Sequence, residues 1–536
     1  MCSLKAFVLL LAFVVVVPGN LYAKKHGTVS GLASPATESG SSQEISSGYH
    51  MNAARTATRV TLDEYIRMVI QNNNDLAVHY LDFKETQETA RGEEGAFEPE
   101  FVTSYQAGED RVRYSQEDKS SVLFAQERDA ASSDFSASVE MLTPTGTTLK
   151  VLHSTRKYKD RTTYDDYDYT SKVGVEVTQP LLKGAGTAPV AQLRAALAES
   201  DEAYHLYRTE KQETVKQALM ACWDLYGAME KLKVRGESVR IARALFENNR
   251  KRAALGRMAE TEVLLAEAGL NKRLAFETMA DQECDAARDR VRTFVSYAQE
   301  AQPLFIDFSH ADRLPDHRAE YAGSMQRAFS YRPEYQVLRH RILKENIRLK
   351  FAENQRWPQV DLKGSYGLNG LGDSVGDAGE NAFHDDYRTW SVGVYFSVPL
   401  MGGIQTRSQL SIAEMNKRKA LLELKSLEVD VANTIHSLTG EVNSAFDQLD
   451  YLSKSSEANE RLLKMVLARF NAGRTSSDEV LNREEDAIEA KEDRLDGFVQ
   501  LQKSMVELRA AEGRLLVQYV GDPGAGLVGE QVAQAE

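Results

Sequence analysis

Few residues of this sequence have the types and the spacing that support catalysis or metal binding. Asp165, Asp166 and Asp168 lie together in the stretch YDDYDY. Carboxylates bind hard cations, but a solvated loop is the favoured interpretation of this stretch. His310 and His317 lie in a proline-containing segment with no cysteine beside them, which does not match a zinc site.

Motifs of known enzymes give no support for catalysis either. The chain has no G-x-x-x-x-G-K-[ST] and no H-E-x-x-H. The stretch GLGDSVG from Gly370 holds the letters of G-x-S-x-G, but its glycines are typical of a loop and not of a buried strand-and-helix unit. We therefore predict no enzyme activity, no cofactor and no metal site.

Two related phrases place acidic side chains next to a glycine. RAALGRMAETEVLLAE begins at Arg252, and RFNAGRTSSDEVLNREE begins at Arg469. Gly256 and Gly473 favour a turn, because glycine adopts the left-handed conformation that ends a helix. Each phrase therefore predicts a helix that stops, turns and starts again.

The helix restart differs between the two phrases. Ser476 and Glu479 have the S-x-x-E spacing of a capping box. In the first phrase Met258 and Ala259 take the places of Thr475 and Ser476. The first restart is therefore predicted to have the weaker cap.

Long helices must position these phrases. No proline falls between residues 190 and 302 or between 400 and 522, and apolar residues recur there at alternating spacings of three and four, as in Val431, Ile435 and Leu438. This spacing is typical of packed coiled-coil helices. An arm of about 65 residues would be roughly 100 Å long.

The segments before these tracts alternate between apolar and polar residues, as strands do. TWSVGVYFSVPL places Val392, Val394 and Phe396 on one face. One hairpin in each segment predicts about four strands per chain. The stretch SVEMLTPTGTTLKVLHS leaves two alternatives open, an extra hairpin that points outward or two additional strands.

The same landmarks occur twice in one order, which predicts an internal duplication. Leu76 matches Tyr335 and Pro99 matches Pro358, and the phrase at Gly256 matches that at Gly473. The predicted division is a signal peptide (1–23), a flexible segment (24–57), a first repeat (58–302, with strands in 97–180 and a helical hairpin in 187–302), a connector (303–320), a second repeat (321–520, with strands in 358–399 and a helical hairpin in 404–520) and a flexible tail (521–536).

Charge and the N-terminus constrain where the protein acts. The net charge of −14 argues against a nucleic-acid partner. Lys5, the apolar run 6–17 and the small residue Ala23 resemble a secretory signal. Cys222 and Cys284 could pair in an oxidising compartment, but two buried free thiols are the favoured interpretation.

Export, alternating strands and the lack of a membrane-spanning apolar run together suggest an outer-membrane barrel. A barrel must close, and about four strands are too few for one chain to close alone. The chain is therefore expected to form oligomers, with the helical hairpins extending into the periplasm. The alternative is a secreted or periplasmic coiled-coil scaffold, and an envelope-bound hydrolase is a distant third.

The ordered series VTLDEYIRMVIQNNNDLAV, GAFEPEF, VTQPLLKG, QRWPQVDLKGSY, FSVPLMGG and the two glycine phrases resembles the TolC family of outer-membrane efflux proteins, over roughly residues 58–520. The resemblance implies a mainly α fold with two repeats, a periplasmic α-barrel and a transmembrane β-barrel shared by a homotrimer. It also implies a passive duct for small molecules or proteins, which docks a periplasmic adaptor and an inner-membrane transporter. Drug efflux and type I secretion both remain open.

The resemblance also gives roles to the glycine phrases. It places them at the periplasmic entrance, where Gly256, Arg257, Gly473 and Arg474 would form the adaptor-docking tips. Two acidic positions that narrow the pore in many members correspond here to Glu479 and Asn482. Glu262 holds the corresponding place in the first repeat.

Overall fold

The computed structural model describes residues 58–113, 127–160, 167–296, 304–308, 318–384, 387–400 and 403–520. They belong to one compact unit, Ala57–Glu536. The predicted signal peptide, the predicted flexible segment and the predicted tail lie outside the described residues. So do Asp165, Asp166, His310 and His317.

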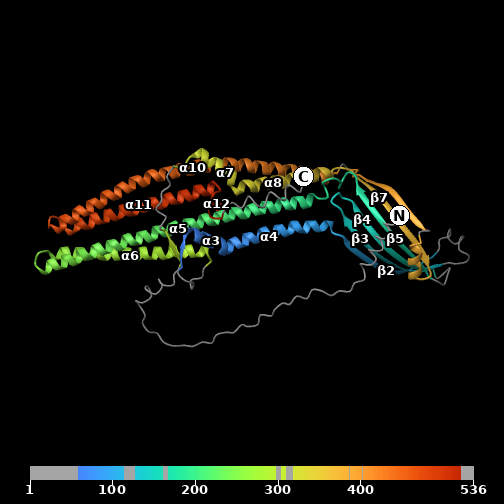
Figure 1. Ribbon diagram of the computed structural model, residues 1–536, viewed down its shortest axis with the longest axis horizontal. Helices are drawn as coiled ribbons and strands as arrows, with labels where there is room; N and C mark the ends of the chain where they lie inside the picture. The colour runs from blue at the N-terminus through green and yellow to red at the C-terminus, as the bar shows by residue number, and fades with distance from the viewer. Residues whose placement is uncertain are drawn as a thin grey trace, which may run out of the picture. The chain divides into compact units, whose positions relative to one another are not determined.

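The described chain is mostly helical with a sheet part, as the sequence predicted. Two long hairpins dominate it (Figure 1): α5 (Ala191–Ala254) with α6 (Glu260–Phe294), and α10 (Ile404–Asn471) with α11 (Ser477–Ala511). The arms α5 and α10 have 64 and 68 residues, so each extends for roughly 100 Å. The predicted long arms are confirmed.

Shorter helices flank the hairpins. They are α3 (Leu62–Asn72), α4 (Asn74–Glu94), the 3-10 turn η2 (Gly95–Phe97), α7 (Tyr321–Tyr331), α8 (Pro333–Gln355), α9 (Val375–Ala382) and α12 (Leu515–Val520). The start of α3 is fixed by a capping box, in which Thr61 and Glu64 each accept a backbone hydrogen bond from the other. None of the helices in the described ranges combines the length and hydropathy that crossing a bilayer requires.

Helix bounds recur along the chain. The helix α7 begins and ends 259 residues after α3 (321 − 62 and 331 − 72). Likewise α11 begins and ends 217 residues after α6 (477 − 260 and 511 − 294). These are the two offsets at which the sequence motifs repeat.

The helices pack around a core that includes both remaining cysteines. Tyr65 and Ile66 of α3 lie against Cys222 of α5 and Cys284 of α6 in one buried cluster. The two cysteines are free, and burial raises the pKa of both thiols. The interpretation as buried free thiols is confirmed.

One sheet holds six antiparallel strands in the order β2-β3-β4-β5-β7-β8. The strands are β2 (Glu100–Arg113), β3 (Glu127–Leu142), β4 (Thr148–Asp160), β5 (Asp168–Pro180), β7 (Gln359–Gly372) and β8 (Arg388–Ser397). The expected number of about four is therefore wrong. The added hairpin β3–β4 pairs on both sides, with β2 and with β5, because its alternation continues that of its neighbours.

A small parallel pair stands apart from this sheet. It joins β1 (Thr58–Thr61) to β6 (Leu304–Asp307), with Thr58 opposite Leu304. The strand β6 lies in the predicted connector (303–320), of which residues 309–317 fall outside the described ranges.

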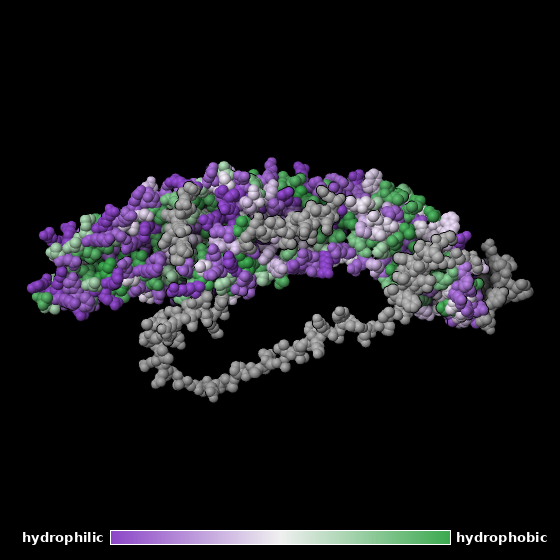
Figure 2. Space-filling model, in the orientation of Figure 1, coloured by the Kyte–Doolittle hydropathy of each residue, from purple (hydrophilic) through white to green (hydrophobic). Residues whose placement is uncertain are grey.

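The two faces of the six-stranded sheet differ in chemistry. On one face of β8, Trp390, Val392, Val394 and Phe396 are 63–70% exposed, and Leu362 of β7 lies opposite Val394. Hydrophobic residues gather over the part of the sheet beside the helices, whose visible surface is mainly hydrophilic (Figure 2). An exposed apolar row of this size marks a surface that meets another molecule or a membrane.

The opposite face of the sheet is polar. Lys150 of β4 contacts Glu140 of β3 at 2.6 Å, and Arg156 contacts Asp134 at 3.4 Å. All four residues have the parity opposite to that of the apolar row in the strand register. The sheet therefore has an apolar side and a polar side.

Candidate functional site

Both predicted turns occur, and both have the same geometry. Gly256 and Gly473 have φ of 67° and 70°. The backbone N–H of the next residue, Arg257 or Arg474, donates to the carbonyl of the residue five positions earlier at 2.9 Å. Each glycine N–H donates three positions back, at 2.8 and 2.9 Å, which completes a Schellman motif. The side chains of both arginines lie exposed beside the turns.

The helix that follows each turn begins as predicted. Ser476 is the N-cap of α11, and its hydroxyl accepts a hydrogen bond from the N–H of Glu479 at 3.4 Å. This is the first of the two hydrogen bonds of a capping box. Ala259 is the N-cap of α6 and has no side-chain cap. The predicted difference in capping is confirmed.

The two tips of one chain pack against each other. Leu245 and Ala266 of the first hairpin share a buried cluster with Phe470 and Leu481 of the second. Arg252 lies over the ring of Phe470 at 5.3 Å, a cation–π contact. The tips therefore form one structural unit within the chain.

Polar contacts fasten this unit at the start of α11. The Nδ2 of Asn249 donates to the Ser477 hydroxyl at 2.7 Å and to the Glu262 carbonyl at 3.1 Å. The Glu262 carboxylate accepts from the Ser477 N–H at 3.1 Å. A carboxylate at a helix N-terminus is stabilising. In the isolated chain Glu262 thus caps the neighbouring hairpin, a contact that the sequence interpretation did not include.

Glu479 and Asn482 lie on the exposed side of α11. Asn482 donates to the carboxylate of Asp478 at 3.1 Å. The residues between them, Val480 and Leu481, are 1% and 8% exposed and face the tip cluster. The two predicted constriction residues therefore share a solvent-facing surface next to the tip, and Glu262 lies within the seam.

A buried ion pair behind the tip was missed by the sequence interpretation. The side chains of Arg273 and Glu484 are 7% and 1% exposed, and the Arg273 Nε donates to the Glu484 Oε2 at 2.6 Å. The guanidinium also donates to the Leu481 carbonyl at 3.1 Å, and Ser238 donates to the other Glu484 oxygen. A charged residue within the apolar stripe of α11 was the available signal.

Further ion pairs continue along the same seam, where α11 lies between α5 and α6. They are Lys272 with Glu485 at 2.6 Å, Arg235 with Glu492 at 2.5 Å and Lys231 with Asp496 at 2.8 Å. They are partly exposed, so each contributes little by itself. Together with Arg273 and Glu484 they hold the two hairpins of one chain together.

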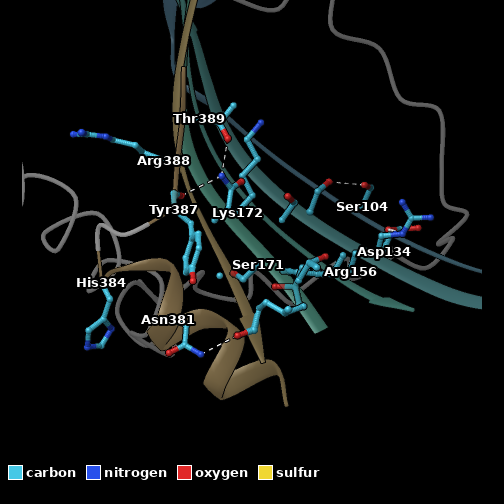
Figure 3. Close-up of a pocket in the computed structure, with 18 of the residues that line it drawn as sticks. Ser104, Asp134, Arg156, Ser171, Lys172, Asn381, His384, Tyr387, Arg388 and Thr389 are labelled. Atoms are coloured by element: carbon cyan, nitrogen blue, oxygen red, sulfur yellow. Dashed lines mark hydrogen bonds and ion pairs between the residues drawn. The ribbon is translucent and has the colours of Figure 1, made fainter. Parts of the chain in front are cut away.

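A hollow of about 1380 Å³ lies at the opposite end of the described chain, on the sheet (Figure 3). Ser104, Asp134, Arg156 and Lys172 project from the strands toward it, and Tyr387 borders it near α9. Its charged groups have both signs. The arrangement is that of a polar, water-accessible surface.

The G-x-S-x-G letters do not form a catalytic site. Ser374 is the N-cap of α9, and its hydroxyl donates to the Asp377 carboxylate at 2.7 Å while it accepts from the Asp377 N–H at 3.2 Å. Neither contact involves a histidine. Within the described ranges, no group of three or more His, Cys, Asp or Glu residues is placed to hold a metal ion.

Known proteins share this sequence and this fold. The sequence profile of one family, described as outer membrane efflux protein, matches residues 65–295 and 325–514. The outer membrane protein TolC of Vibrio cholerae is 23% identical over 359 residues, which cover 66% of this chain and 79% of that protein. The alkaline protease secretion protein AprF of Pseudomonas aeruginosa is 24% identical, over 60% of this chain and 65% of that protein.

A solved structure agrees in fold. The outer-membrane channel OprN superimposes with a TM-score of 0.62 at 17% identity, over 84% of this chain and 89% of that one. At this identity the likeness concerns the fold alone.

Proposed function

The chain belongs to the outer membrane efflux protein family, and we propose that it is the outer-membrane duct of a tripartite efflux or type I secretion system. It lies in the outer membrane, as its named relatives do. The proposal assigns it passive export of small molecules or proteins. Its partners are a periplasmic adaptor and an inner-membrane transporter, which supplies the energy.

One observation carries this proposal: a two-sided sheet and two helical hairpins of roughly 100 Å are parts of one chain. The exposed apolar face with Trp390 and Phe396 suits lipid, and the polar face with Lys150 and Glu140 suits water. The hairpins are long enough to extend far from the membrane. A soluble scaffold would have no use for the exposed apolar row.

The sheet is proposed to close as a barrel between copies. Among the described strands, β2 and β8 have a neighbour on one side only. Open edges do not persist in lipid, and β8 of one copy would meet β2 of the next in antiparallel order. Three copies of a six-stranded sheet would form a barrel of eighteen strands (3 × 6), within the range of known outer-membrane barrels.

The hairpin tips are proposed to form the periplasmic entrance. Gly256 and Gly473 with Arg257 and Arg474 present two exposed turns per chain for the adaptor. Glu479 and Asn482, exposed beside the second turn, would line the narrowest part of the channel. Three Glu479 carboxylates around one axis would favour cations, whereas Glu262 serves the seam between the tips.

We also propose that the chain arose by internal duplication, with the repeats 58–302 and 321–520 joined by the connector 303–320. The coincident bounds of α3 with α7 and of α6 with α11 support this division. Within it, the first repeat contributes four strands of the sheet and the second contributes two.

Three measurements test the duct. The protein should fractionate with the outer membrane, remain a trimer in detergent and conduct ions as single channels in planar bilayers. A monomer that is soluble without detergent and does not conduct would favour the coiled-coil scaffold instead. Crosslinking from positions near Gly256 and Gly473 would identify the captured adaptor.

A further inference from the structure

Within one chain, α11 packs on α5 through two pairs of side chains near the tip. Leu481 of α11 and Leu245 of α5 share the tip cluster and are 8% and 6% exposed. Glu484 and Ser238, joined by a hydrogen bond, are 1% and 2% exposed. These pairs define the seam inside the chain.

The same four residue types stand at the matching positions of the other repeat. At the 217-residue offset that relates α6 to α11, Leu481 and Glu484 correspond to Leu264 and Glu267 of α6. Leu245 and Ser238 correspond to Leu462 and Ser455 of α10. Here all four are exposed, with Leu264 at 59% and Leu462 at 43%.

We propose that α6 of one copy packs on α10 of the next, so that Leu264 and Glu267 contact Leu462 and Ser455 of the partner subunit. The inference rests on the proposed assembly of copies and gives it a specific interface. Each copy would offer α6 to one neighbour and α10 to the other. Such a head-to-tail contact generates a closed ring when the rotation allows it.

This placement explains two exposed leucines that the isolated chain leaves without cover. A leucine with about half of its surface in water loses burial that contributes roughly 1.5–3 kcal/mol when complete. In the chain's own seam, the same residue types at the matching positions are buried. A second copy of the chain is the occupant whose surface already has this shape and chemistry.

The ion pairs of the seam inside the chain are not repeated between copies. Arg273, which neutralises Glu484, corresponds to Ala490. Lys272 and Glu485 correspond to Glu489 and Ala268, and Arg235 and Glu492 correspond to Leu452 and Ala275. The contact between copies therefore keeps the leucine pair and the serine–glutamate pair and lacks the charged partners.

This difference predicts which seam separates first. The Glu267 carboxylate would be covered by Ser455 of the partner subunit without an arginine, and a buried carboxylate without a cation is unfavourable. The seam inside the chain has the buried Arg273–Glu484 pair and further ion pairs. The entrance is therefore expected to open along the seams between copies, with the two hairpins of each chain moving together.

Crosslinking between chains tests the interface. Chains with Leu264→Cys and chains with Leu462→Cys, distinguished by size tags, are co-expressed and treated with a short bismaleimide. The expected product is a covalent dimer with one chain of each type, absent when either variant is expressed alone. The double variant Leu245→Cys/Leu481→Cys is the matched control and should crosslink only within single chains.

Native mass measurement separates the possible failures. An intact conducting trimer without the mixed dimer would overturn this interface and leave the duct standing. A monomer in detergent would overturn the proposed assembly itself. In a second arm, Ala490→Arg should make the trimer more resistant to dissociation, and Glu267→Gln should abolish that gain; equal resistance of Ala490→Arg and the parent chain would contradict the assignment.

Discussion

Arg273 of α6 and Glu484 of α11 form an ion pair with side chains that are only 7% and 1% exposed, although 211 positions separate them in the chain. The pair joins the first helical hairpin to the second close to their tips. It also gives the seam inside the chain a feature that position 490, an alanine, does not provide for the contact between copies.

Arg273→Ala is expected to destabilise the chain strongly. The substitution leaves the Glu484 carboxylate buried without its cation, which costs about 3–5 kcal/mol. The matched control is Arg288→Ala, which removes an ion pair with Asp285 on the same helix whose side chains are 33% and 64% exposed and should cost less than about 1 kcal/mol. Thermal unfolding in detergent measures both, and equal effects would contradict the assignment.

Gly473→Ala is expected to weaken the second hairpin tip. The residue has φ of 70°, and a Cβ in the left-handed region costs roughly 1–2 kcal/mol. Gly440 provides the control, because it lies inside α10 and a Cβ added there would meet open space. Gly440→Ala should stabilise the helix by about 0.5–1 kcal/mol. The two variants should therefore shift the unfolding temperature in opposite directions.

The charge beside the second tip is expected to set ion selectivity. If Glu479 lines the narrowest part, Glu479→Gln should lower the preference for cations, and Asn482→Asp should raise it by adding a second ring of carboxylates. The reversal potential across a planar bilayer in a salt gradient reports both changes. Glu489→Gln, an exposed carboxylate further along the same helix, is the control. Selectivity that is unchanged in both test variants would place the constriction elsewhere.

A histidine between α5 and α8 is expected to make stability depend on pH. Burial, followed by the charges of His340 and Arg208, lowers the pKa of His205 to about 4. The nearby ring of Tyr204 and the Asp201 carboxylate, 3.5 Å from His340, complete its surroundings. The folded chain holds this imidazole neutral, whereas the unfolded chain protonates it near pH 6.5.

The sign of this effect follows from proton uptake. The contribution of His205 is fully present above about pH 6.5 and is lost as the pH falls toward 4, because the unfolded state binds the additional proton. Each unit of separation between the two pKa values is worth at most about 1.4 kcal/mol. Unfolding temperatures between pH 4 and 8 should fall less steeply with acid in His205→Gln; parallel curves would contradict the prediction.

The features predicted correctly depend on neighbours in sequence. The turns at Gly256 and Gly473, the cap at Ser476 and the missing cap at Ala259 follow from residues within one helical turn. The long helices follow from their spacing and from the lack of proline. Local patterns predict local structure because the hydrogen bonds involved close over three to five residues.

The strand number was wrong for a reason outside local pattern. Alternation indicated strands in 97–180 but left open whether the middle hairpin joins the sheet. In the structure Val139 of β3 lies opposite Phe101 of β2, and Val151 of β4 lies opposite Val175 of β5. Membership is decided by pairing on both sides, which is a property of the assembled sheet.

By itself, the sequence determined the helices, their turns, the alternating strands and the repeat that relates the two halves, because propensity and periodicity act within short windows. Only the tertiary structure decided that Glu262 caps the neighbouring hairpin and that Glu484 is buried against Arg273 whereas Glu267, its counterpart, is exposed. These contacts join residues more than two hundred positions apart. Identical residues in the two repeats thus have different surroundings, because burial depends on which helix packs against them.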